Sequence, residues 1–172
     1  MASDPKVAVV VGASRGIGYA SAVGLAKAGA DVVVAARTER DLKLLAQSIE
    51  TVGRRSLAIK VDVKKKSDIE ALIRATLKQF GKIDVLVYSS GVAFPEKTLA
   101  ESTDEHFEET IAVNLRGAFW AMRGVLTVGK MLERRSGRII LIGSDSSKRG
   151  DAGLAVYAAT KHAILGLARC LA

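Results

Sequence analysis

The segment that most constrains this chain is Val7 to Gly18, which reads VAVVVGASRGIG. Its apolar, β-branched run is typical of a buried strand, and the run stops at Gly12. Two more glycines, Gly16 and Gly18, follow before an apolar-periodic segment begins. Glycine suits a backbone that turns sharply and approaches a ligand closely, because any Cβ would be in the way. The segment therefore predicts a strand, a tight turn and the start of a helix.

The predicted turn is a candidate anion site. The first N–H groups of a helix have no intrahelical acceptor, and they favour negative charge. Between its glycines the turn carries Ser14, Arg15 and Ile17, in the spacing G-x-x-x-G-x-G. A glycine motif alone is weak evidence, but this one follows a strand and opens a helix, as a dinucleotide site requires. We expect it to hold a pyrophosphate; the alternative is a structural turn that binds nothing.

The rest of the chain alternates apolar strands with helices. Strands are expected at 7–11, 32–36, 56–61, 84–88 and 138–142, and helices at 17–28, 39–52, 67–80, about 103–132 and from about 154 onward. Because the strands are nearly continuous in Val, Ile and Leu, both faces of the sheet should be covered. The pattern predicts a doubly wound parallel α/β sheet in a single domain, residues 1–172.

Capping signals mark two helix starts, and the end of the chain suggests an incomplete sheet. Thr38 is expected to cap the second helix, and Ser67 with Glu70 has the spacing of a capping box. The last helix is expected to be still running at Ala172, which leaves the fifth strand at a sheet edge. We therefore expect a C-terminally incomplete fold, completed by further sequence or by a partner.

Composition and charge exclude several classes of protein. Cys170 is the only cysteine, so no intrachain disulfide forms and a reducing compartment is expected. Without an apolar leader or a membrane-length apolar run, the expected location is cytoplasmic, with no membrane partner. The net charge is +8, but the basic clusters at 54–55, 64–66 and 134–135 lack interleaved aromatic residues. We interpret them as solvated surface and expect no nucleic-acid partner.

The end of the second strand indicates which dinucleotide is bound. An NAD site usually presents an acidic residue there, whereas an arginine accommodates the 2′-phosphate of NADP. Here the strand ends Ala36-Arg37 without a carboxylate, and Arg15 lies in the glycine turn. Two guanidinium groups could converge on one phosphate. We infer NADP(H) rather than NAD; the alternative is that Arg37 caps a surface turn.

A third group of residues suggests proton chemistry. Tyr157 and Lys161 are four residues apart, so they share one face of the last helix. A neighbouring ammonium stabilises a phenolate, which lets a tyrosine exchange a proton with a carbonyl or alcohol oxygen. Ser144 follows the fifth strand and could polarise a substrate carbonyl. Asn114 interrupts an apolar helical stretch, which also fits a core asparagine with satisfied hydrogen bonds. The sequence contains no metal-ligand spacing.

In these residues the chain resembles the short-chain dehydrogenases/reductases, most of all 3-oxoacyl-carrier-protein reductases and related carbonyl reductases, over nearly its whole length. The matching features, in the family's order, are the glycine turn, Asp62, Asn114, Ser144 and the run Tyr157-Ala158-Ala159-Thr160-Lys161. The resemblance implies a Rossmann-like fold with Tyr157 as acid/base, Ser144 orienting the substrate oxygen and Asn114 holding a water. It also implies that Lys161 binds the nicotinamide ribose and tunes the tyrosine. The implied cofactor contacts are Gly12, Ser14, Arg15, Gly16, Ile17, Gly18, Arg37, Asp62, Val63, Ser90, Gly91, Tyr157 and Lys161.

The chain also departs from the pattern of this family. Val11 stands where the family usually has threonine, and Tyr88-Ser89-Ser90-Gly91 replaces Asn-Asn-Ala-Gly. These two sites normally meet across adjacent strands, so the paired change is interpreted as compensatory. Family members continue past the position of Ala172 through a substrate-covering loop, and their long helix and Tyr/Lys helix form a homo-oligomer interface.

Two functions therefore remain open. The first is an NADP(H)-dependent oxidoreductase of a small-molecule carbonyl or alcohol, such as a 3-oxoacyl thioester or another ketone, assembling as a homo-oligomer if the fold is completed. The second is a truncated or non-catalytic nucleotide-binding member of the same family. NADPH binding measured against turnover separates them.

Overall fold

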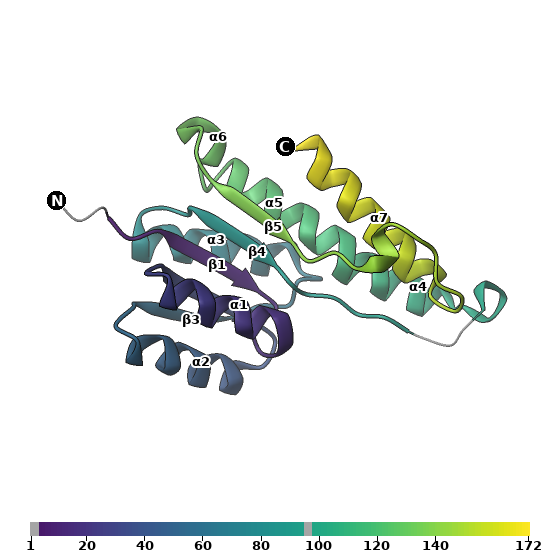
Figure 1. Cartoon of the computed structure of the whole chain (residues 1–172), viewed down its shortest axis with the longest axis horizontal. Helices are drawn as coiled ribbons and strands as arrows, with labels where there is room; N and C mark the ends of the chain where they lie inside the picture. The colour runs from purple at the N-terminus through teal and green to yellow at the C-terminus, as the bar shows by residue number, and fades with distance from the viewer. Residues whose placement is uncertain (1–3, 95–97) are drawn as a thin grey trace.

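The computed structural model describes residues 4–94 and 98–172 as a five-stranded sheet covered by helices (Figure 1). All strands are parallel, in the order β3-β2-β1-β4-β5. The strands are β1 (Val7–Val11), β2 (Asp31–Ala36), β3 (Ser56–Lys60), β4 (Val85–Tyr88) and β5 (Arg138–Leu141). This order confirms the doubly wound α/β fold, and it places β5 at the expected edge.

Helices fill both faces of the sheet. The helical segments are α1 (Gly16–Lys27), α2 (Glu39–Thr51), α3 (Lys66–Phe80), η1 (Leu99–Glu101), α4 (Asp104–Thr110), η2 (Ile111–Arg116), α5 (Gly117–Leu126), α6 (Met131–Arg134), η3 (Asp145–Ser147) and α7 (Ala155–Cys170). In Figure 1, α1 and α2 lie on one side of the sheet, and α3 and α5 lie on the other. Among the described residues, none of these helices combines the length and hydropathy needed to span a bilayer.

The side chains of β1 divide between two cores, which is why this strand reads as an unbroken apolar run. Ala8 and Val10 belong to the core under α1 and α2, whereas Val9 and Val11 belong to the core under α3 and α5. Successive side chains of a strand point to opposite faces, so a strand covered on both sides needs apolar residues throughout. β1 is therefore the central strand, covered by helices on both faces.

The predicted long helix of about 103–132 was wrong only after Leu126. Helix α4 continues through a six-residue π-helical turn, η2, into α5, which ends at Leu126. The N–H of Gly129 donates to the carbonyl of Gly124 at 2.8 Å, and Lys130 has a φ of 59°. Left-handed backbone at Lys130 breaks the helical path, so α6 is a separate short helix. The last helix likewise ends at Cys170 rather than running on to Ala172.

Both predicted side-chain caps were also wrong. Within residues 4–94 and 98–172, neither Thr38 nor the N-cap residue of α3 makes a side-chain capping bond. Helix α3 begins at Lys66, because a turn in which Lys65 N–H donates to the Asp62 carbonyl already winds the chain. Ser67 therefore lies inside the first turn, and its hydroxyl donates to the Asp68 carboxylate.

All three basic clusters contain ion pairs: in the cluster at 64–66, Lys64 pairs with Glu109 and Lys66 with Glu70, and the other two clusters pair with buried carboxylates. Asp31, fully buried at the start of β2, pairs with Arg54 at 2.5 Å and with Arg55 at 2.6 Å. Asp84, just before β4, pairs with Arg134 at 3.0 Å and accepts a hydrogen bond from the Val7 N–H. These ion pairs tie the loop before β3 and helix α6 to the amino ends of neighbouring strands.

We predict that Asp31→Asn destabilises the fold near neutral pH. Burial alone would raise the pKa of Asp31, but hydrogen bonds from Arg55 and Arg54 hold the pKa below its ordinary value. A depressed folded-state pKa stabilises the fold above the unfolded pKa, and that stabilisation is lost as pH falls through the folded pKa. The variant should lose about 1–3 kcal/mol in urea unfolding at pH 7, and the difference should vanish in acid.

The exposed residue Asp41 provides the matched control for this measurement. Asp41→Asn should change the free energy of unfolding by less than about 0.5 kcal/mol. A loss in Asp31→Asn that stays constant from pH 7 down to pH 3 would contradict the electrostatic explanation.

Candidate functional site

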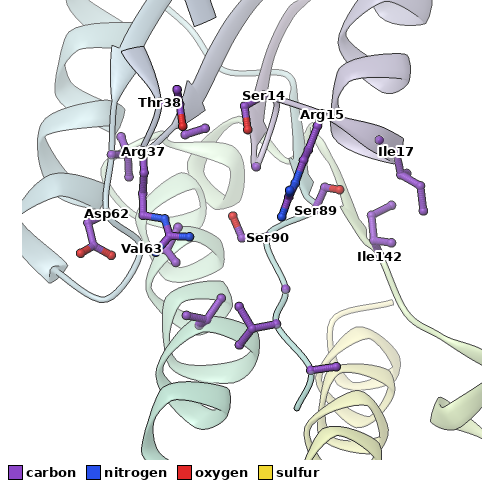
Figure 2. Close-up of a pocket in the computed structure, with 18 of the residues that line it drawn as sticks. Ser14, Arg15, Ile17, Arg37, Thr38, Asp62, Val63, Ser89, Ser90 and Ile142 are labelled. Atoms are coloured by element: carbon purple, nitrogen blue, oxygen red, sulfur yellow. The ribbon is translucent and has the colours of Figure 1, made fainter. Parts of the chain in front are cut away.

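A cavity of about 600 Å³ opens at the carboxyl ends of the strands (Figure 2). It is lined by the glycine turn after β1, the end of β2, the segments after β3, β4 and β5, and the first turns of α7. Ligands of open parallel sheets bind at this edge. The predicted residues that line it are Gly12, Ser14, Arg15, Gly16, Ile17, Arg37, Asp62, Val63, Ser90, Gly91, Tyr157 and Lys161.

The glycine turn is shaped by close approaches of backbone to backbone. Gly12 has a φ of 86°, and a Cβ there would lie 2.6 Å from the backbone nitrogen of Ser90. A Cβ on Gly18 would overlap the carbonyl oxygen of Gly12. Gly18 lies behind the turn rather than in the cavity wall. Two of the three glycines are therefore required sterically, so that α1 can start directly against the turn.

The N-terminus of α1 is an electropositive end of the cavity. Its first turn carries no acidic residue, and its first N–H groups have no acceptor within the helix. Arg15 and Arg37 extend into the cavity from the turn and from the end of β2, as Figure 2 shows. Both are exposed, and no ion pair within residues 4–94 and 98–172 involves either of them.

Asp62 lies in the wall of the same cavity, in a turn that its own carboxylate helps to hold. Its Oδ1 accepts a hydrogen bond from the Lys64 N–H at 3.1 Å, and its own N–H donates to Asp68 at 3.0 Å. Val63 follows in the same turn and also lines the cavity. The loop between β3 and α3 thus presents one carboxylate and one apolar side chain to a ligand.

Tyr157 and Lys161 meet at the opposite end of the cavity. The ammonium of Lys161 lies 5.5 Å from the centre of the Tyr157 ring and donates to the carbonyl of Ile142 at 2.7 Å. Only 6% of Lys161 is exposed, and burial lowers the pKa of its ammonium. A desolvated ammonium interacts strongly with a nearby phenolate, because little water screens the pair.

The structure does not bring Ser144 into the cavity wall. Its hydroxyl caps the short helix η3, accepting from the Ser146 N–H at 3.2 Å and donating to Asp145 at 3.1 Å. Gly143, the residue before it, does line the cavity, together with Tyr157. Ser144 therefore lies one residue beyond the wall, with its hydroxyl engaged by its own loop.

Asn114 is a buried asparagine whose amide is bonded to protein. Its Oδ1 accepts from the Val92 N–H at 2.8 Å, and its Nδ2 donates to the Val92 carbonyl at 2.9 Å and to the Thr160 hydroxyl at 3.1 Å. The Thr160 hydroxyl in turn donates to the Tyr157 carbonyl at 2.7 Å. Asn114 thus links the segment after β4 to the helix that carries Tyr157 and Lys161.

Sequence reasoning missed several residues of this site. Thr160 was quoted within a motif but given no role, although it is fully buried between Asn114 and Tyr157. Several of the other missed residues follow the carboxyl end of a strand, which was the available signal: Thr38, Ser89, Val92, Ile142 and Gly143. Asp41 and Val113 line the cavity from α2 and η2, where the sequence carries no such signal. Within the described parts of the chain, no cluster of His, Cys, Asp or Glu is arranged to hold a metal ion.

Comparison with known proteins identifies the class. Residues 6–172 match the family model for short chain dehydrogenases, and the chain belongs to that family of oxidoreductases. A putative ketoacyl reductase of Streptomyces coelicolor is 38% identical over 168 residues, which is 98% of this chain and 64% of the relative. A 3β-hydroxysteroid dehydrogenase of Mediterraneibacter gnavus is 33% identical over 98% of this chain and 60% of its own length.

Solved structures give the same result at the level of the fold. An actinorhodin polyketide ketoreductase variant crystallised with NADPH superposes with a TM-score of 0.94 at 37% identity, covering 99% of this chain. The match spans 66% of that ketoreductase, so this chain corresponds to about two thirds of its relatives' length.

We predict opposite effects for two alanine substitutions in α1. Gly18→Ala places a methyl group against the Gly12 carbonyl and should destabilise the fold or prevent it, with loss of several kcal/mol in thermal or urea unfolding. Gly24→Ala is the matched control, because a Cβ there meets nothing within 4 Å. Alanine at that position should stabilise the helix by up to about 1 kcal/mol. Equal effects at the two positions would contradict the steric account.

Proposed function

We propose that this chain forms the catalytic and cofactor-binding part of an NADP(H)-dependent reductase of carbonyl compounds. The observation that carries the proposal is one cavity with two different ends. An electropositive glycine turn with Arg15 and Arg37 forms one end, and the Tyr157–Lys161 pair forms the other. A dinucleotide is divided in the same way, because its phosphate groups lie at a distance from its reactive ring.

The residues present fit such a cofactor. The absence of a Cβ at Gly12 and Gly18 lets the backbone approach closely, and the first N–H groups of α1 are available to a pyrophosphate. Arg37 would contact the 2′-phosphate, with Arg15 nearby, and Asp62 and Val63 would contact the adenine. Ser90, Gly91 and Lys161 would hold the nicotinamide half. The bound cofactor supplies the hydride, and the protein supplies binding, orientation and proton transfer.

Tyr157 is the proton donor in this proposal, and Lys161 is the group that stabilises its deprotonated form. As a carbonyl is reduced, its oxygen becomes an alkoxide that must be protonated, and a phenol at the cavity wall can give that proton. The adjacent ammonium stabilises the phenolate left behind. Because Lys161 uses one of its three donors on the Ile142 carbonyl, its position beside the ring is fixed from β5.

Ser144 and Asn114 have supporting roles in the same proposal. The Ser144 hydroxyl now donates to Asp145, and a substrate carbonyl would replace that carboxylate as its acceptor. Asn114 holds the segment after β4 in place through Val92, and its Oδ1 is proposed to keep contact with a water in the proton path. The favoured substrate class is a 3-oxoacyl thioester or another ketone, in line with the ketoacyl reductases among the relatives.

The first test of this function is Tyr157→Phe. The variant should still bind NADPH, measured by quenching of protein fluorescence, but reduce a 3-oxoacyl thioester about 10²–10⁴ times more slowly. Tyr19→Phe, the same change at an exposed position on α1, should have no effect on turnover. Equal turnover by the Tyr157 variant and the unmutated chain would eliminate Tyr157 as the proton donor.

A second candidate function is nucleotide binding without catalysis. The observation that favours it is the Ser144 hydroxyl, which is engaged by its own loop. Saturable NADPH binding without reduction of any ketone would establish this alternative.

We predict that Arg37→Ala changes the choice of cofactor. Hydrogen bonds to charged groups contribute about 1.5–3 kcal/mol, so the Kd for NADPH should rise about tenfold or more. The Kd for NADH, which lacks the 2′-phosphate, should change less than about twofold. Arg74→Ala, on the exposed face of α3, is the control and should alter neither value. An equal rise of the Kd values for NADPH and NADH in Arg37→Ala would show that Arg37 does not contact the 2′-phosphate.

A further inference from the structure

Tyr88 connects the sheet to the helix that carries Asn114. It is the last residue of β4, it pairs in register with Val11, and only 3% of it is exposed. Its hydroxyl donates a hydrogen bond to the carbonyl of Val113 at 2.6 Å. Burial raises the pKa of Tyr88, so the hydroxyl keeps its proton and stays a donor at any working pH.

The carbonyl of Val113 needs this donor because of the π-helical turn η2. In an α-helix the N–H of Gly117 would donate four residues back, to Val113. Here it donates five residues back, to the carbonyl of Ala112. The Val113 carbonyl therefore loses its α-helical donor in a buried place, where an unpaired carbonyl is costly. The Tyr88 hydroxyl supplies a replacement from the sheet.

Gly117 leaves the space that the Tyr88 side chain uses. A Cβ on Gly117 would lie 2.5 Å from the Tyr88 hydroxyl oxygen and 2.9 Å from the carbonyl oxygen of Val63. The tyrosine, the π-turn and the glycine are thus sterically matched to one another. Val63 lines the cofactor cavity, so this contact lies directly behind the cavity wall.

The next residue of the π-turn makes a second link to the same loop. Asn114 bonds to both the N–H and the carbonyl of Val92, at 2.8 and 2.9 Å. Val113 and Asn114 therefore hold Tyr88 and Val92, the two residues that flank the segment 89–91. All three residues of that segment line the cavity, and Ser90 is the residue that Gly12 approaches.

We propose that Tyr88 is a positioning residue for the cofactor site, and that with Asn114 it clamps both ends of segment 89–91 onto the π-turn. The inference rests on the proposed function for its cofactor, but the clamp itself is a property of the protein alone. The backbone of Tyr88 stays paired in the sheet, so removing its hydroxyl should release the π-turn from the sheet, loosen Val92 through Asn114, and weaken the binding of NADPH.

The test uses Tyr88→Phe, which keeps the buried ring and removes only the hydroxyl. Amide hydrogen exchange measured by NMR reports the clamp, because the Val92 N–H is protected by Asn114. The reference is the Val32 N–H in β2, which donates to the carbonyl of Arg55, the residue before β3. Exchange at Val92 should accelerate about tenfold more than exchange at Val32, and the Kd for NADPH should rise about threefold to tenfold.

Tyr19→Phe provides the matched control, because Tyr19 is 42% exposed on α1. It should change neither the exchange ratio nor the affinity for NADPH. Equal acceleration at Val92 and Val32 in Tyr88→Phe would show a general loss of stability and overturn the proposal. Unchanged exchange at the Val92 N–H would also overturn it, as would faster exchange there with an unchanged Kd for NADPH. If the unmutated chain binds no NADPH, the proposed function fails, while the exchange ratio still decides whether the clamp exists.

Discussion

The structure depends on how closely the chain after β1 approaches the chain after β4. A single methyl group at Gly12 would meet the backbone nitrogen of Ser90, and another at Gly18 would meet the carbonyl of Gly12. These approaches let α1 begin at once, with its free N–H groups facing the cavity. They also make segment 89–91 part of the same wall. The shape of the glycine turn and one wall of the cavity therefore depend on this close contact.

Charge is divided between the two ends of the sheet. At the amino ends of the strands, buried carboxylates of Asp31 and Asp84 hold Arg54, Arg55 and Arg134 in ion pairs. At the carboxyl ends, Arg15 and Arg37 extend into the cavity from exposed positions. The +8 net charge of the sequence therefore includes two kinds of arginine. One kind holds loops and helices to the sheet, and the other is available to an anionic ligand.

Much of the fold was predictable because β-strands covered on both faces must be apolar throughout. The strand positions and the turn after β1 follow from that rule and from the glycine spacing. The meeting of Val11 with Tyr88 was expected and is confirmed by the register of β1 and β4. That this pair of changes is compensatory stays a prediction; the structure shows that the Tyr88 side chain extends from the sheet to the carbonyl of Val113.

What the sequence could not reveal depends on hydrogen bonds between distant residues. The π-turn at η2 was not predicted from the apolar pattern, because it is defined by a backbone bond that runs five residues back instead of four. The break between α5 and α6 includes left-handed backbone at Lys130, a residue type that gives no such signal. The orientation of Ser144 depends on Asp145 and Ser146, whose geometry is set within the loop itself.

The bond from Lys161 to the carbonyl of Ile142 has a consequence for the edge of the sheet. Ile142 directly follows β5, the edge strand, and the side chain of Ile140 within that strand is 40% exposed. Outer strands open at lower free energy than central ones, because fewer contacts hold them. When the end of β5 frays, the ammonium loses its anchor and the phenol of Tyr157 loses its charged neighbour. In the proposed function, the placement of Lys161 beside Tyr157 therefore depends on the outermost strand as well as on the helix that carries both residues.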